Sequence, residues 1–301
     1  MKTLIADGSN YFGMTGFPIL VGRSVSKRKP TDPPPHPHDL TEVQHRHDFH
    51  ELVIVTKGRG LQCLEGMDLP ITAGDVFLLQ GRQRHYFHDR QDLELTNVMY
   101  NPAQLALPEN ELRRMPGYCA MFILEPAYRQ QHRFASRLHL KRLQLAHVEL
   151  MTDEMERESH KKEVGYEVFL RAKLLEVITF LSRIYTEGES TETQALVRVG
   201  HVIGALENGF SKDWTLDELV ALAHMSKSNL LAVFRKATGQ TPINYLMRLR
   251  IQRAMQMLQK SDATITEVAF AVGFNDSNYF TRQFRTITGG SPRQFRKQNS
   301  V

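Results

Sequence analysis

The chain has 301 residues, of which 41% are hydrophobic and 24% are charged, and its formal net charge is +5. This length can form two domains with separate cores, and the composition is that of a soluble globular protein. No run reaches the roughly 18 apolar residues of a membrane span, the N-terminus lacks the layout of a secretory signal, and the two cysteines suit a reducing compartment. We therefore expect a cytoplasmic protein without a membrane segment. From Ala195 onward, 14 Lys and Arg stand against 7 Asp and Glu, which is typical of a part that binds a polyanion.

The first third of the chain has the pattern of a compact antiparallel β domain. Residues 30–38, PTDPPPHPH, are too rich in proline for a helix or an interior strand and predict an extended loop. From Val43 to about Tyr100, short β-type runs (ELVIVT, GLQCLEG, DVFLLQ, HYFH and LTNVMY) alternate with glycine turns such as KGRG and TAGD. This alternation predicts an antiparallel barrel or sandwich.

The first strand of this region contains HRHDFHE, residues 45–51. Alternate residues of a strand share a face, so His45, His47 and Glu51 should point into the barrel and His50 outward. Three interpretations are open for such a cluster. It is a catalytic metal centre, or a pocket that binds an effector with or without a metal, or a group of buried histidines that hydrogen-bond to one another.

The spacing of these residues resembles the first motif of the cupin barrels, and His85, eleven residues after Gly74, stands where the second motif has a histidine. The resemblance implies a cupin-like barrel in which three histidines and one glutamate hold Mn, Fe, Ni or Zn. The residues concerned are His45, His47, Glu51 and His85. The match is incomplete, because Gln80 and Arg82 replace the proline and glycine of the second motif.

Residues 102–135 contain several prolines and no clear period, so we assign them no regular element. Two helices are predicted next, at about 137–158 and 164–186, and the second carries apolar residues at helical spacing: Val168, Leu175, Ile178 and Leu181. We expect this pair of helices to form a dimer contact, although its apolar stripes could equally cap the barrel. The polar stretch TEGESTETQ, residues 186–194, predicts a linker.

The rest of the chain repeats one pattern. LDELVALAHMSKSNLLAVFRKATGQTP, residues 216–242, and ITEVAFAVGFNDSNYFTRQFRTITGGSP, residues 265–292, each read as a helix, a short turn and a second helix. Ser226 in the first repeat and Asp276 or Ser277 in the second stand where the second helix needs an N-cap. The pattern predicts two helix-turn-helix motifs, joined by a connector helix, whose second helices enter the DNA major groove.

GFNDSNYFTRQFRTITGGSPRQFR resembles the closing signature of the AraC/XylS family of bacterial transcription regulators, and residues 200–297 resemble its DNA-binding domain throughout. The resemblance implies base-reading positions at Ser228, Leu231 and Ala232 in the first repeat and at Ser277, Asn278, Thr281 and Arg282 in the second. Arg282 suits guanine and Asn278 suits adenine. Leu231 and Ala232 can contact only thymine methyl groups, so we expect the second recognition helix to discriminate more between sequences. Arg235 and Arg285 are expected to contact phosphates.

The segment HDFHELVIVTKGRG…ITAGDVFLLQGRQRHYFH resembles the N-terminal domains of the sugar-responsive members of that family, particularly the rhamnose regulators. This resemblance implies an effector pocket in which a sugar contacts His45, His47, Glu51 and His85, and in which Tyr86 stacks on the apolar face of the sugar. The same histidines and glutamate remain the candidate metal ligands. DNA binding itself requires no cofactor.

We therefore predict a two-domain protein: a cupin-like β-barrel sensor over 1–135, a helical dimerisation segment over 136–186, a linker over 187–194 and an all-α DNA-binding domain over 195–301. Its predicted function is sequence-specific regulation of transcription. The expected partners are double-stranded DNA, a small effector, RNA polymerase and a second copy of the chain. Two alternatives stay open: a metal-dependent cupin enzyme, an oxygenase or isomerase, that carries a DNA-binding module, and a regulator whose degenerate barrel binds nothing.

Overall fold

The computed structural model describes residues 4–6, 8–12, 16–25, 43–129 and 136–299. It separates into two compact units: an N-terminal unit of residues 1–109 and 120–196, and a C-terminal unit of residues 110–119 and 197–301. The boundary near residue 196 lies close to the predicted one, but the short segment 110–119 joins the C-terminal unit, which the sequence did not indicate. The predicted proline-rich loop, 30–38, lies outside the described residues.

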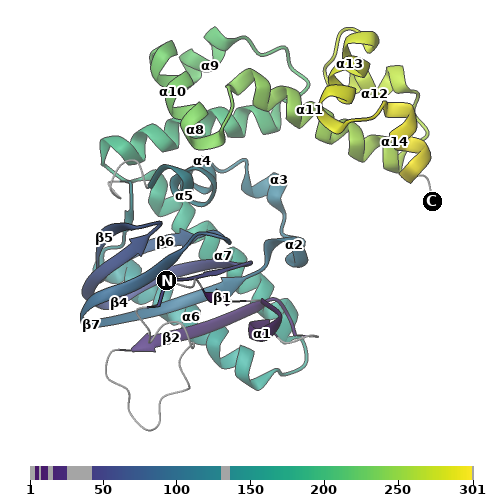
Figure 1. The fold of residues 1–301 in the computed structure, drawn as a ribbon. Helices are drawn as coiled ribbons and strands as arrows, with labels where there is room; N and C mark the ends of the chain where they lie inside the picture. The colour runs from purple at the N-terminus through teal and green to yellow at the C-terminus, as the bar shows by residue number, and fades with distance from the viewer. Residues whose placement is uncertain (1–3, 7, 13–15, 26–42, 130–135, 300–301) are drawn as a thin grey trace. The chain divides into compact units, whose positions relative to one another are not determined.

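The N-terminal unit is built on one sheet of eight strands (Figure 1). The strand order is β1-β3-β7-β4-β6-β8, while β2 also pairs with β7 and β5 with β4. The strands are β1 (Leu4–Ala6), β2 (Ile19–Val25), β3 (His45–His47), β4 (His50–Leu64), β5 (Met67–Thr72), β6 (Asp75–Leu79), β7 (His85–Tyr100) and β8 (Leu138–His139). Strands β1 and β3 run parallel, and the other pairs are antiparallel. The predicted cupin-like sheet domain is confirmed.

Two of these strands are longer than the sequence pattern predicted. KGRG was expected to form a turn, but β4 runs through it for 15 residues and pairs with the 16-residue β7. The pairing register shifts between Val55 and Leu61, so bulges absorb the glycine-rich stretch without ending the strand. Gly58 makes this possible, because its φ is +70° and a Cβ there would lie 2.2 Å from the carbonyl oxygen of Asp92 on β7.

Apolar side chains from β4, β5, β6 and β7 fill the interior of the sheet. They are Val53, Val55, Leu64, Leu69, Ile71, Phe77, Leu79, Phe87, Leu93 and Leu95. A core of this size holds the strands in one register, because a one-residue slip would turn each strand's apolar set outward. Polar side chains that interrupt this apolar interior are therefore candidates for a functional role.

The N-terminal part of the chain also contains short helices, in stretches where the sequence indicated no regular element. They are α1 (Gly8–Phe12), α2 (Pro102–Leu105), α3 (Glu109–Leu112), α4 (Pro116–Tyr118), the π-helical turn η1 (Cys119–Leu124) and α5 (Glu125–Tyr128). The predicted pair of long helices is confirmed as α6 (Arg142–Lys161) and α7 (Tyr166–Thr186). Of the predicted stripe, helix α7 buries Ile178 and Leu181, whereas Leu175 is half-buried and Val168 is 71% exposed, so the stripe is only partly covered.

The C-terminal unit is helical. Helix α8 (Thr191–Asn208) begins inside the predicted linker and runs on into this unit. It is followed by α9 (Leu216–Ala223), α10 (Lys227–Thr238), α11 (Pro242–Lys260), α12 (Ile265–Ala271), α13 (Ser277–Thr288) and α14 (Pro292–Asn299). Figure 1 shows the two predicted repeats, α9–α10 and α12–α13, at opposite ends of α11. The two helix-turn-helix motifs and their connector are therefore present.

Side-chain caps set the starts of these helices. The first helix of each repeat opens with a capping box, Thr215 with Glu218 and Thr264 with Glu267. The second helix of each repeat opens at a predicted cap, Ser226 or Asp276, whose side chain accepts a backbone N–H three residues on. Local chemistry therefore reproduces the same helix boundaries in both repeats.

Segment 110–119 joins the C-terminal unit through close backbone contact. A Cβ on Gly200 of α8 would lie 2.3 Å from the carbonyl oxygen of Pro116, so only glycine permits this approach. The Arg113 guanidinium also donates to the Tyr245 hydroxyl of α11 at 3.4 Å. Within the described ranges, no helix is both long and apolar enough to cross a membrane.

Candidate functional site

Three of the four predicted His and Glu residues meet inside the sheet. His47 lies on β3, Glu51 on β4 and His85 on β7, and one donor atom from each lies within 4.8 Å of the others. His47 Nε2 is 3.1 Å from Glu51 Oε2, and His85 Nε2 is 3.5 Å from the same oxygen. All three side chains are at most 4% exposed. Strand β7 lies between β3 and β4 in the sheet, so the strand of His85 adjoins both the strand of His47 and the strand of Glu51.

Backbone carbonyls fix the tautomers of the histidines. A carbonyl oxygen can only accept, so His47 Nδ1 donates to the oxygen of Phe49 at 2.7 Å and His85 Nδ1 donates to that of Gln83 at 3.0 Å. In the neutral rings, the Nε2 lone pairs are then turned toward the Glu51 carboxylate. Lone pairs and a carboxylate that converge in a buried site repel each other unless a proton or a metal ion lies between them.

The charge state of Glu51 is tied to these rings. Burial raises the pKa of the Glu51 carboxyl, but hydrogen bonds and positive charge from His47 and His85 outweigh this and hold it well below its usual value. The lowered pKa favours the ionised form of this carboxyl. An ionised, buried carboxylate needs a cationic partner, which is what metal-ligating carboxylates have.

The other predicted residues of this site lie around the trio or away from it. His45 is buried, its Nδ1 is 3.2 Å from the Val43 carbonyl oxygen, and its ring packs 4.3 Å from the His85 ring, outside the trio of donor atoms. Tyr86 lies on the opposite face of β7, where its ring is 5.4 Å from that of His88, because successive residues of a strand alternate. It does not line the cluster with His85.

His50 was expected to point outward and to lie at the surface. Its ring instead packs edge-on against Tyr100 at 5.4 Å, and burial lowers the pKa of His50 to about 4. Tyr100 is only 3% exposed and lies on this second, covered face of the sheet. The outer face of β4 is therefore packed here, and this tyrosine belongs to the core.

Sequence reasoning missed Gln62, a second polar group in the interior. It is fully buried and lies on the same face of β4 as the core residue Leu64. Its neighbours on the adjacent strands are Leu69 of β5 and Phe87 of β7, which also belong to the core. Within the described part of the chain, neither its Nε2 nor its Oε1 has a hydrogen-bond partner. A buried amide without partners costs free energy, so this position points to a polar ligand or water. The signal in the sequence was one amide inside the apolar run GLQCL.

The predicted DNA-facing residues lie on α10 and α13. Ser228, Ala232 and Arg235 on α10 and Asn278, Arg282 and Arg285 on α13 are exposed, whereas Leu231, Ser277 and Thr281 are half-buried. The opposite faces of these helices are anchored in the core by Phe234 and Phe280, which are fully buried. Each repeat thus presents a rigid helix with one accessible polar face, the arrangement that a recognition helix needs.

The exposed faces of α10 and α13 differ in chemistry. On α13, the guanidinium of Arg282 lies 5.8 Å from the centre of the exposed Tyr279 ring, which limits the side chain's rotamers without occupying its donors. On α10 the corresponding face carries no arginine before Arg235. Two further arginines of this unit have partners within the protein. Arg253 forms an ion pair with Glu207, and Arg296 donates to the Ala263 carbonyl oxygen. They are structural residues in this protein.

Two family models match the chain. The AraC-like ligand binding domain matches residues 34–154, and the helix-turn-helix domain matches residues 219–298. The HTH-type transcriptional activator RhaS of Klebsiella pneumoniae (strain 342) is 28% identical over 254 residues, 84% of this chain and 87% of its own length. The HTH-type transcriptional activator RhaR of Enterobacter sp. (strain 638) is 28% identical over 258 residues, 85% of this chain and 88% of its own length.

A solved structure is similar to part of the chain. The C-terminal domain of AraT, a response regulator from Geobacillus stearothermophilus, is 26% identical and covers 35% of this chain and 87% of its own, with a TM-score of 0.34. The two family matches fall on the two parts that the geometry distinguishes, the sheet with its His and Glu cluster and the paired helix-turn-helix motifs.

Proposed function

This chain belongs to the AraC family of transcription regulators and binds DNA through its helix-turn-helix domain; from that premise we propose that its sheet domain senses a sugar. The observation that carries the proposal is the set of buried polar groups inside the apolar sheet, the trio of His47, Glu51 and His85 together with Gln62. A sugar offers several hydroxyls that both donate and accept, which suits a carboxylate, imidazoles and an amide. The relatives RhaS and RhaR are named transcriptional activators, which supports a regulatory role for this chain.

The effector can act only through a difference in affinity between two arrangements of the protein. We infer that sugar binding favours one arrangement of the two DNA-binding units of a dimer at a promoter, where RNA polymerase is the further partner. The protein would do this in the cytoplasm. The barrel would bind its effector without turning it over, in contrast to a cupin enzyme; conversion of a bound sugar by the purified protein would contradict this.

The experiment that tests the sensor is thermal unfolding of the full chain with a panel of monosaccharides and sugar acids. At a ligand concentration 100 times its dissociation constant, we expect stabilisation of about 2.7 kcal/mol. Gln62→Leu should abolish most of this stabilisation. The same substitution should leave the free protein as stable as wild type or more stable, by up to about 1–3 kcal/mol, because it removes a buried amide without partners.

Gln91→Leu serves as the control, because Gln91 lies on β7 and is exposed. It should keep the full response to the sugar. If Gln62→Leu lowers the stability of the free protein, the amide is part of the structure and not of the site. If no sugar stabilises the wild type, the proposed effector class is wrong. That result would not bear on DNA binding by the helix-turn-helix domain.

The trio also fits a divalent transition metal. His47, Glu51 and His85 would hold it, since the Nδ1–H groups of both rings are bonded to backbone carbonyls, the usual arrangement behind a metal-ligating histidine. Such an ion would supply a Lewis-acidic point for the hydroxyls of an effector. His45 would stand beside this set rather than in it, which differs from the predicted set of four ligands.

A metal titration tests this. Added Zn²⁺ or Mn²⁺ should raise the unfolding temperature of the metal-stripped full chain, and dialysed protein should retain about one equivalent by elemental analysis. His85→Ala should lose both effects, because it removes one of three donors. His88→Ala, three residues along the same strand but on its other face, should keep them. Wild-type protein that neither retains a metal nor responds to one would show that protons alone bridge the trio.

We propose that α6 and α7 form the contact between two copies of the chain. Leu143 and Leu150, one heptad apart on α6, are 83% and 63% exposed. Val164, in the turn before α7, is fully exposed, and Val168, in the first turn of α7, is 71% exposed. Leu150→Glu combined with Val168→Glu should convert a dimer into a monomer in analytical ultracentrifugation. Glu158→Lys on α6 should leave the mass unchanged. A monomeric wild-type protein would contradict the proposal.

A further inference from the structure

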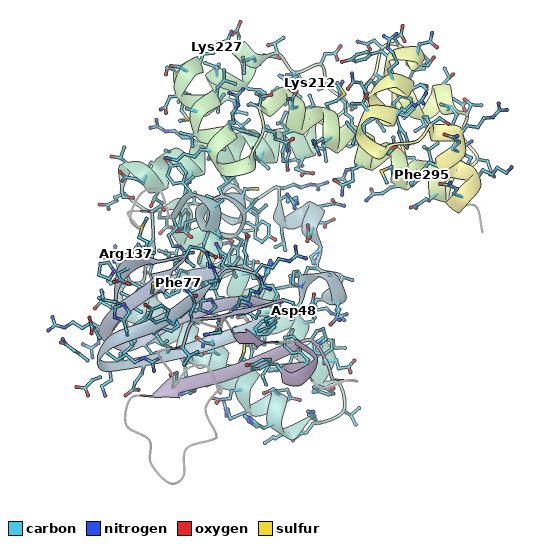
Figure 2. The ribbon with its side chains drawn as sticks, viewed as in Figure 1. Asp48, Phe77, Arg137, Lys212, Lys227 and Phe295 are labelled. Atoms are coloured by element: carbon cyan, nitrogen blue, oxygen red, sulfur yellow. The ribbon has the colours of Figure 1, made fainter. Side chains whose placement is uncertain are left out.

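The short segment from Gly209 to Trp214, between α8 and α9, makes contacts that helix-turn-helix geometry alone does not require. We call it the bracing segment; Lys212, labelled in Figure 2, lies in it. Arg250 on the connector α11 is only 7% exposed and donates from Nε to the Phe210 carbonyl oxygen at 2.7 Å and from Nη2 to that of Lys212 at 2.8 Å. A nearly buried arginine thus fastens the segment to the connector helix.

The same segment reaches the turn of the second repeat. Asn275 Nδ2 donates to Asp213 Oδ2 at 2.9 Å. Gly273, with φ of +94°, faces the segment so closely that a Cβ there would lie 2.6 Å from the Ser211 carbonyl oxygen. The Arg250 guanidinium also lies 5.7 Å from the centre of the Phe274 ring. Backbone, side-chain and ring contacts therefore converge where α12 turns into α13.

At its other end, the bracing segment is continuous with the first repeat. Trp214 Nε1 donates to the Gly209 carbonyl oxygen at 2.8 Å, which closes the segment on itself, and Lys212 pairs with Glu218 at 2.9 Å. Glu218 is the residue that caps α9 together with Thr215. The start of the first repeat and the turn of the second are thus tied together by a route that does not run along α11.

We propose that the bracing segment fixes the placement of α10 relative to α13 and thereby sets the spacing of the two base blocks that the protein reads. Helix α11 has 19 residues and is about 28 Å long, and a single helix of that length can bend. The second tie closes a ring with it and removes that freedom. Arg250 and Asn275 are positioning residues in this scheme, because they act on the recognition helices and not on the bases.

DNA geometry makes the consequence measurable. One inserted base pair moves the second block by about 3.4 Å and turns it by about 34–36° around the duplex. A rigid pair of recognition helices cannot follow that displacement, whereas a loosened pair can follow part of it. Spacing tolerance is thus a readout that general loss of affinity or of stability would not change.

The probe is a DNA duplex selected by the wild-type full chain from a library with a randomised core. Two conserved blocks should emerge at one spacing. Inserting one base pair between them should weaken wild-type binding by at least about tenfold, whereas binding by Asn275→Ala and Arg250→Gln should weaken by less than about threefold. Both variants should also select blocks at more than one spacing.

Arg248→Gln is the matched control. Arg248 lies on the same helix as Arg250 and is exposed, and the substitution removes the same charge as Arg250→Gln does. It should keep the wild-type penalty for the inserted base pair, whatever happens to its overall affinity. Asn275 is exposed, so Asn275→Ala should fold even if Arg250→Gln does not. A folded Asn275→Ala protein with the full wild-type penalty would overturn the proposal, and so would a wild-type selection that yields only one block.

Discussion

Arg129→Met should lower the free energy of unfolding of the N-terminal unit by about 3–5 kcal/mol, because it leaves a buried carboxylate without its partner. Arg129 is fully buried; its Nε donates to Glu125 Oε1 at 2.9 Å and its Nη2 to the Leu78 carbonyl oxygen of β6 at 2.9 Å. Its guanidinium also lies 5.1 Å from the centre of the Phe77 ring, which Figure 2 labels. Glu125 is 2% exposed, so water cannot replace the lost cation.

The measurement is denaturant unfolding of the full chain, followed by circular dichroism and by fluorescence. The single tryptophan, Trp214, lies in the C-terminal unit, so the transition that leaves its emission unchanged reports the N-terminal unit. The double variant Glu125→Leu with Arg129→Met should recover most of the loss, since neither charge then remains buried. Arg157→Met, which removes an exposed arginine, should change little. A loss as large in the double variant would show that shape, not charge, is what Arg129 contributes.

The C-terminal unit could be predicted closely because its signals are local. Ser226 and Asp276 accept the backbone N–H groups that they were expected to cap, and one apolar face of α10 and one of α13 are buried as the helical period requires. The repeat doubles the information at every position, since one copy confirms the other. Arg250 shows the limit of this reasoning: its partners lie 38 and 40 residues away, and no period reports such contacts.

The interior of the sheet domain was less predictable, because register there depends on bulges. Strict alternation from Glu51 would turn Gln62 outward, eleven residues further along. The register shifts around Gly58 restore it to the inner face, next to Leu64. Only the pairing of β4 with β7, a contact between distant strands, determines these shifts. Tyr86 is the opposite case, since alternation from His85 alone puts it on the outer face, contrary to the pocket position that the family resemblance implied.

The segment 110–119 could not be assigned from the sequence either. Its contacts are with α8 and α11, about a hundred residues later in the chain, and they depend on the absence of a side chain at Gly200. The chain therefore passes between the two units at 109–110, 119–120 and 196–197. An effector that alters the N-terminal unit has three covalent connections through which it can act on the DNA-binding unit, and not only the predicted linker.

Arg282→Ala should weaken binding to the selected duplex by about 1–3 kcal/mol, roughly 5- to 150-fold, and relax the preference at one base position. Arg282 is exposed on α13, and the adjacent Tyr279 ring restricts its rotamers, so less entropy is lost when its two donors meet a guanine. Leu231→Ala on α10 should cost less, because it removes at most an apolar contact. Competition binding against duplexes that vary one base at a time measures both effects.

Arg235→Ala separates base reading from charge. Arg235 is exposed in the last turn of α10, and as a phosphate contact its loss should weaken binding equally for all sequences and lower the salt slope by about one. Arg282→Ala should instead change the ranking of sequences. If the two variants lose affinity uniformly and with the same change in salt slope, Arg282 binds phosphate, and the discrimination expected of the second repeat must come from Asn278 or from the shape of the duplex.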